Sequence, residues 1–75
     1  MNNGYLSQEA FLKAIQICQG YNTVKIAINY NPEANHVTQN WALVILEGNT
    51  GLIKHLIKEG FSLYLKSWGL IVSMI

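Results

Sequence analysis

The chain contains no arginine, no aspartate, one cysteine and one proline. A single cysteine, Cys18, excludes an internal disulfide, and the four carboxylate side chains are all glutamates. The two histidines, His36 and His55, stand apart from any cysteine or carboxylate cluster, so we expect neither a structural metal nor a cofactor. A chain of 75 residues must therefore stabilise itself with a well-filled core, with self-association as a possible supplement.

Charged side chains are also scarce. They make up 12% of the chain, where about 25% is usual, and the formal net charge is +1. This balance gives no electrostatic reason to expect nucleic acid or an anionic membrane as the main partner. Weak mutual repulsion between copies favours self-association, as a homodimer or a larger oligomer.

Long hydrophobic runs are missing as well. The longest, Trp41 to Leu46 and Leu70 to Val72, fall far short of the ~18 residues needed to span a bilayer. Met1–Gly4 lack the basic and apolar regions of a secretory signal. We therefore expect a cytoplasmic protein with no membrane partner, and a single domain over residues 1–75 in which residues 1–6 are an N-terminal extension.

The chain is nevertheless 51% hydrophobic, and two segments have helical spacing. Ser7 is a good N-cap for a helix over about residues 8–19, with Gly20 expected to end it in the left-handed conformation. Thr50 is the expected N-cap of a second helix that Gly60 ends. The apolar stripes of the two helices consist of Phe11, Ala14, Ile15 and Cys18, and of Leu52, Ile53, Leu56 and Ile57.

Between the two helices, alternating apolar residues predict a strand from Thr23 to Tyr30 and a second from about Val37 to Glu47. Asn31–Ala34 fits a type I turn, and pairing Tyr30 with Asn35 would set Ile28 opposite Val37. Asn31 and Pro32 also suit the start of a short helix, so residues 31–40 are either a hairpin loop or a short helix. The continuous apolar run over residues 42–46 indicates a strand covered on both faces. In a two-layer domain the helices cover only one face of the sheet, so the other face would need a second object to cover it, such as another copy of the chain.

After the second helix, Phe61 to Lys66 again alternates. Ser67–Gly69 predicts a tight turn or a bulge, and Leu70 to Ile75 predicts a last strand. That strand carries no charge, so we expect it either inside the sheet or against another chain.

The order is α-β-β-α-β-β. The predicted fold class is α+β, a two-layer sandwich with two helices on one face of a four-stranded, mostly antiparallel sheet. The expected core residues are Phe11, Ile15, Ile26, Ile28, Leu43, Ile45, Leu56, Ile57, Leu63 and Leu65.

Catalytic chemistry finds little support. Cys18 lies on an apolar stripe, and the glutamates belong to different elements without a spacing that pairs them. We therefore predict no enzyme and no catalytic, cofactor or metal residues. One segment, between a predicted strand and a predicted helix, is a candidate anion site, because N–H groups at the start of a helix can bind an anion. It lacks the Gly-Lys-Ser/Thr ending of a phosphate-binding loop. The candidate residues are Gly48, Asn49, Thr50, Gly51 and Lys54.

The leading hypothesis is a small non-enzymatic interaction module, homo-oligomeric through its sheet face or its C-terminal strand, or bound to another protein. The alternative is a small-ligand or anion-binding regulatory domain that uses the 48–54 loop. A third hypothesis is single-stranded nucleic-acid binding through Tyr64, Lys66 and Trp68, with Lys25 and Asn29 on the same face. The candidate interaction surface consists of Tyr30, Trp41, Tyr64, Lys66, Trp68, Leu70, Val72 and Met74.

Overall fold

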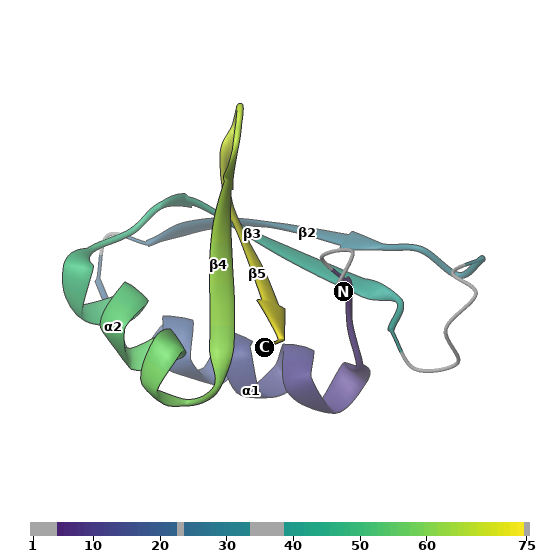
Figure 1. Cartoon of the computed structure of the whole chain (residues 1–75), viewed down its shortest axis with the longest axis horizontal. Coiled ribbons are helices and arrows are strands. Elements are labelled where there is room, and N and C mark those ends of the chain that lie inside the picture. The colour runs from purple at the N-terminus through teal and green to yellow at the C-terminus, as the bar shows by residue number, and fades with distance from the viewer. Residues whose placement is uncertain (1–4, 23, 34–38, 75) are drawn as a thin grey trace.

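The computed structural model describes residues 5–22, 24–33 and 39–74. It has two helices, α1 (Gln8–Gln19) and α2 (Thr50–Lys58), and five strands. The strands are β1 (Tyr5–Leu6), β2 (Lys25–Tyr30), β3 (Trp41–Glu47), β4 (Phe61–Lys66) and β5 (Gly69–Met74). The protein is thus an α+β domain in which both helices pack on one face of a curled antiparallel sheet (Figure 1).

The first helix has the predicted bounds, and its N-cap is confirmed because the Ser7 Oγ accepts a hydrogen bond from the Ala10 N–H at 3.1 Å. Two expectations about helix ends are wrong. Gly20 has an ordinary right-handed backbone (φ −79°). The N-cap of α2 is Asn49 and not Thr50, since the Asn49 Oδ1 accepts from the Leu52 N–H at 2.9 Å. Gly60 does take a left-handed φ of 99°, which suits glycine.

The strand order places β3 and β5 in the interior of the sheet. β3 pairs with β2 on one side and with β1 and β5 on the other, and β5 also pairs with β4. Among the residues described, β2, β4 and the two-residue β1 each pair with one neighbour only, so β2 and β4 are the long edge strands. Of the two predictions for the last strand, the interior position is the one found; Ile75 lies outside the described residues.

Tyr5 and Leu6 correct the expectation that residues 1–6 are an extension. They form β1, in which Leu6 pairs with Trp41 and is fully buried. Two residues carry too little pattern to reveal a strand, and the side chain of Leu6 belongs to the core beside α1. Residues 1–4 lie outside the described residues.

The pairing of β2 with β3 differs from the predicted register by six residues. Tyr30 pairs with Trp41 and Ile28 with Leu43, so the connection spans residues 31–40. At its base the Asn31 N–H donates to the Asn40 carbonyl at 2.8 Å, and the Asn40 side chain donates back to the Asn31 carbonyl at 2.8 Å. The predicted hairpin is confirmed, but the predicted four-residue loop is wrong. Because the register differs by an even number of residues, each side chain still points to its predicted face of the sheet. Thr23, Asn35, His36 and Val37 lie outside the described residues.

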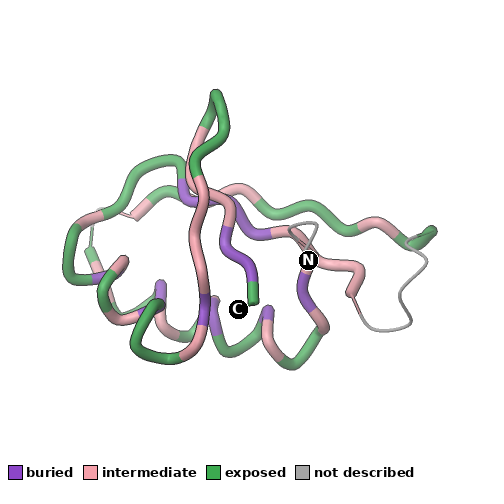
Figure 2. Tube along the Cα trace, in the orientation of Figure 1, coloured by how far each residue is buried: buried purple, intermediate pink, exposed green. Residues whose placement is uncertain are grey.

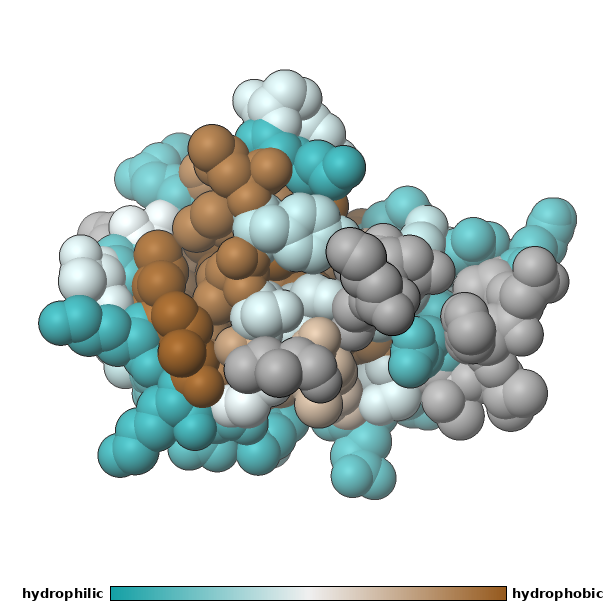
Figure 3. Space-filling view, viewed as in Figure 1, coloured by the Kyte–Doolittle hydropathy of each residue, from teal (hydrophilic) through white to brown (hydrophobic). Residues whose placement is uncertain are grey.

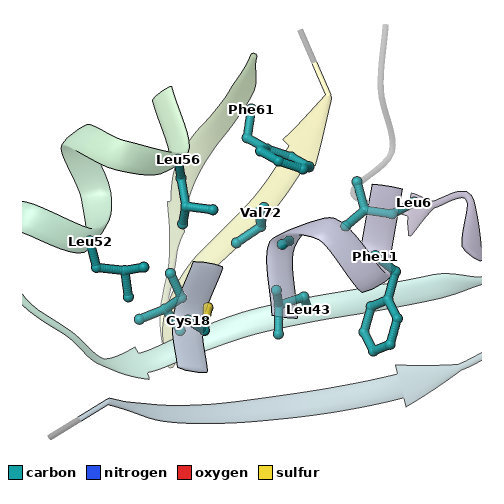
Figure 4. Packing of buried hydrophobic residues seen from close by; sticks show 10 residues of the cluster. Leu6, Phe11, Cys18, Leu43, Leu52, Leu56, Phe61 and Val72 are labelled. Carbon is teal, nitrogen blue, oxygen red and sulfur yellow. The ribbon is translucent and has the colours of Figure 1, made fainter. Parts of the chain in front are cut away.

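The core lies between the helices and the sheet, where α1 and α2 bring their inner faces onto β3 and β5 (Figure 4). Phe11, Leu43, Ile45 and Leu56 are buried as predicted, while Ile15, Ile26 and Leu63 are half-buried and pack against the core. The buried hydrophobic residues outside the list of expected core residues are Leu6, Val44, Phe61 and Val72, together with Ala14, Cys18 and Leu52 of the predicted apolar stripes.

Three predicted core residues are in fact exposed. Ile28, Ile57 and Leu65 have exposed fractions of 51%, 52% and 77%. Ile28 and Leu65 do point to the helix side of the sheet, because they pair with Leu43 and Leu70. The helices end before they reach these positions, and Figure 2 shows the exposed stretches along β2 and at the tip of the β4–β5 hairpin.

The opposite face of the sheet, which we call the outer face, carries neither of the helices in the described part of the chain. Val44 nevertheless has only 4% exposure there. The hairpin of β4 and β5 crosses the sheet steeply, and its tip rises on the side away from the helices (Figure 1). The curl of the sheet therefore buries Val44 within one chain, and the expectation that a second object must cover it is wrong.

Gly69, the first residue of β5, should be intolerant of a side chain. A Cβ atom there would lie 2.7 Å from the Val44 Cγ1 and 2.8 Å from the Ile45 carbonyl oxygen, which belongs to the backbone and cannot rotate away. We expect Gly69→Ala to lower the free energy of unfolding by about 2 kcal/mol, measured by urea denaturation.

The matched control is Gly20→Ala. Its Cβ would have its nearest neighbour at 3.4 Å and its backbone is right-handed, so we expect a change within about 0.5 kcal/mol. Equal losses in the two variants would contradict the close approach of β5 to β3.

Candidate functional site

The predicted interaction residues lie on two faces and do not form one surface. Five of them lie on the helix side of the sheet, as their pairing partners show: Tyr30, Trp41, Leu70, Val72 and Met74. Val72 is fully buried and so cannot contact a partner, which corrects its inclusion. Trp41 is half-buried, with its ring 4.6 Å from both Phe11 and Tyr30 between ring centroids. Leu70 is half-buried, and Met74 is 40% exposed.

The other three residues, Tyr64, Lys66 and Trp68, lie at the β4–β5 hairpin. The Lys66 Nζ is 5.8 Å from the centre of the Tyr64 ring, at the outer limit of a cation–π contact. Lys25 is instead within 3.7 Å of a Glu47 carboxylate oxygen on β3. The cations that the nucleic-acid hypothesis would combine are thus separated, since Lys25 is on the edge strand β2 and Lys66 is on the opposite edge strand β4.

A different surface, on the helix side at β4, combines two exposed apolar side chains with one that is half-buried. We call it the β4 patch and define it as Ile57, Leu63 and Leu65. Leu63 and Leu65 share one face of β4, and α2, which carries Ile57, packs against this strand. Figure 3 shows hydrophobic residues gathered over β4 and α2, bordered by hydrophilic ones. The sequence suggested these residues as core, and their spacing could not show that they stay uncovered.

The 48–54 segment does bring its anion-site candidates to the start of α2. The Leu52 N–H is already occupied by the Asn49 side chain, and the Ile53 N–H by the Asn49 carbonyl at 3.2 Å. Thr50 and Lys54 are exposed, and Gly51 uses its carbonyl to accept from the Tyr21 hydroxyl at 3.3 Å. Glu47, just before Gly48, puts negative charge beside this segment. The geometry is that of an ordinary capped helix.

A polar contact that the sequence did not suggest joins α2 to the segment after α1. The Tyr21 hydroxyl lies 3.1 Å from the His55 Nδ1 as well as 3.3 Å from the Gly51 carbonyl oxygen. The hydroxyl has one hydrogen, so both contacts are satisfied when it donates to Gly51 and His55 Nδ1–H donates to it. His55 is half-buried and has Tyr21 as its partner. The 34-residue separation explains why no sequence motif marks this pair.

Cys18 is buried in the core, and this burial raises the pKa of its thiol. A raised pKa keeps the thiol protonated and poorly nucleophilic at neutral pH.

Among the described residues there is no group of three or more metal-ligating side chains. Over the same residues, neither helix has the length and apolar character needed to cross a membrane.

Comparison of the chain with protein-family models, with curated proteins and with solved structures finds no match. The chain's own geometry therefore carries the functional argument.

The Tyr21 contact predicts a measurable stability effect. Tyr21→Phe removes the hydroxyl and leaves the Gly51 carbonyl and the His55 ring without this partner. We expect a loss of about 1 kcal/mol in the free energy of unfolding. Tyr30→Phe is the control, because the Tyr30 hydroxyl lies outside this network, and it should change the stability by no more than about 0.3 kcal/mol. Matching effects of the two substitutions would argue against the contact.

Cys18 predicts an alkaline loss of stability. Its pKa is raised in the folded state, so the folded chain holds the thiol proton more tightly than the unfolded chain. This contribution is complete below the ordinary thiol pKa of about 8.5 and declines as the pH rises through the folded value. Between pH 7.5 and 9.5 the wild type should lose more stability than Cys18→Ala. Parallel pH profiles would exclude the effect.

Proposed function

We propose that the chain is a small non-catalytic interaction module of the cytoplasm that self-associates, with a second copy docking on the β4 patch and the free edge of β4. The observation that carries this proposal is the 77% exposure of Leu65, on an edge strand beside the exposed Ile57 of α2. Buried in a contact, a leucine of this kind contributes about 1.5–3 kcal/mol.

The two sheet edges differ in their suitability for strand pairing. β2 carries a register irregularity between Lys25 and Ile26, and the ion pair of Lys25 with Glu47 lies at that end. Bulges and charged residues are devices that protect an edge from pairing. β4 pairs with β5 without interruption over six residues, and its one charged residue, Lys66, is the last. The edge that is open to a further strand is therefore β4.

A second copy of β4 is a suitable occupant of this edge. Two antiparallel copies related by a two-fold axis satisfy each other's backbone N–H and C=O groups with one self-complementary surface. When Leu63 pairs with its own counterpart, Leu65 comes opposite Phe61 and both β4 patches lie on the same side of the joined sheet. The net charge of +1 adds little repulsion. This arrangement replaces the earlier idea of pairing through the C-terminal strand, because β5 already has a neighbour on each side.

The test substitutes a surface leucine inside the β4 patch and one outside it. Leu65→Glu places a charge in the proposed contact of each copy, so we expect the dimer dissociation constant to rise at least tenfold, corresponding to about 1.4 kcal/mol. Leu12→Glu on α1 makes the same chemical change at a site that is 51% exposed and should leave association unchanged.

Sedimentation velocity from about 1 to 200 μM measures association, and circular dichroism checks that each variant is folded. A wild-type chain that stays monomeric over this range contradicts the proposal. If Leu12→Glu weakens dimer formation as much as Leu65→Glu does, the contact is not at β4.

A further inference from the structure

The outer face of the sheet contains a pocket of about 190 Å³, on the opposite side from the β4 patch. Its floor consists of small and medium side chains from two neighbouring strands: Ala27 of β2, and Ala42 and Val44 of β3. Ala27 pairs directly with Val44. Two alanines at adjacent outer-face positions leave the floor lower than its surroundings.

Larger side chains surround this floor. Ala42 lies between Asn29 of β2 and Tyr5 of β1, its partners on either side, and Val44 lies between Ala27 and Ile71 of β5. The other two lining residues are Ile28, between Ala27 and Asn29 on β2, and Trp68, in the turn that joins β4 to β5. The hairpin tip that carries this turn rises on the helix-free side (Figure 1), which explains how a residue so near the edge strand reaches a hollow over β2 and β3.

The lining restricts the chemistry of a ligand. Among the described residues that line the pocket none is charged, so this lining suits an uncharged molecule. Trp68 is 59% exposed and offers an indole face for stacking, and the exposed amide of Asn29 can both donate and accept a hydrogen bond. A cavity of about 150 Å³ holds benzene, so about 190 Å³ fits one substituted ring.

We infer that this pocket binds a small, uncharged, planar aromatic molecule with one hydrogen-bonding substituent, its ring against Trp68 over the Ala27–Ala42 floor and its polar group towards Asn29. A few well-placed polar groups in a mostly apolar hollow are typical of small-molecule sites. The inference does not depend on self-association, because its residues come from the outer face and the β4 patch lies on the helix side.

The experiment uses p-cresol as the probe and follows amide and indole N–H chemical shifts of the full chain. We expect saturable shifts concentrated at Ala27, Ala42, Ile71 and the Trp68 indole, all fitting one dissociation constant. Two compounds of similar size test the ligand class: 4-methylcyclohexanol is not planar, and 4-methylbenzoate is charged. Each should bind at least tenfold more weakly than p-cresol.

Three variants test the location. Ala42→Leu fills the floor and should abolish the saturable shifts. Trp68→Ala, in an exposed turn, should weaken binding at least tenfold. Leu46→Ala removes an exposed leucine that is not among the lining residues and should bind p-cresol as the wild type does.

The inference is overturned by shifts that are scattered or do not saturate, by equal binding of 4-methylcyclohexanol, or by unchanged binding in a folded Ala42→Leu variant. If Ala42→Leu does not fold, Trp68→Ala decides the question, and wild-type affinity in that variant overturns the inference.

Discussion

The pairing of β3 with β5 is the contact on which the whole domain depends. It joins the first half of the chain, α1 and the β2–β3 hairpin, to the second half, α2 and the β4–β5 hairpin. At its centre Leu43 lies opposite Val72, and both side chains are fully buried. Each half contributes only part of the buried cluster, so this seam is what joins the two parts into one core. Gly69 allows the two strands to approach closely at its end.

Several apolar side chains on the helix side of the sheet stay exposed because the helices are short. At 1.5 Å per residue, the 12 residues of α1 extend about 18 Å and the nine of α2 about 14 Å, whereas the molecule extends 33 Å. The helices cover the middle of the sheet and leave its ends open. Leu65 is uncovered at one end, and Ile28 and Tyr30 are uncovered on β2.

The curl of the sheet gives its two faces different surfaces. On the helix side the exposed side chains of Ile57 and Leu65 lie beside the free edge of β4, a combination suited to another protein surface. On the outer face the raised β4–β5 hairpin and the two alanines make a hollow of about 190 Å³, which matches a small molecule. The two proposals thus use separate residues and can each hold or fail alone.

Local pattern was enough to place most elements. Helical spacing after Ser7 located α1, and alternation located β4. The absence of charge predicted a last strand either inside the sheet or against another chain, and the structure shows the first. These features depend on neighbours in sequence, because a helix cap and the spacing of apolar residues are each set within a few residues. The antiparallel hairpins and the α+β class followed from the order of these elements.

Properties that depend on distant residues were beyond such patterns. The register of β2 on β3, the strand β1, and the Tyr21–His55 contact are set by packing across the chain, as is the exposure of Ile28, Ile57 and Leu65. A periodic apolar residue identifies a face, but whether that face is covered depends on how far a helix packed against it extends. The same limit applies to the pocket, since Ala27, Ala42 and Trp68 become neighbours only when the sheet curls, and the curl is a property of five paired strands together.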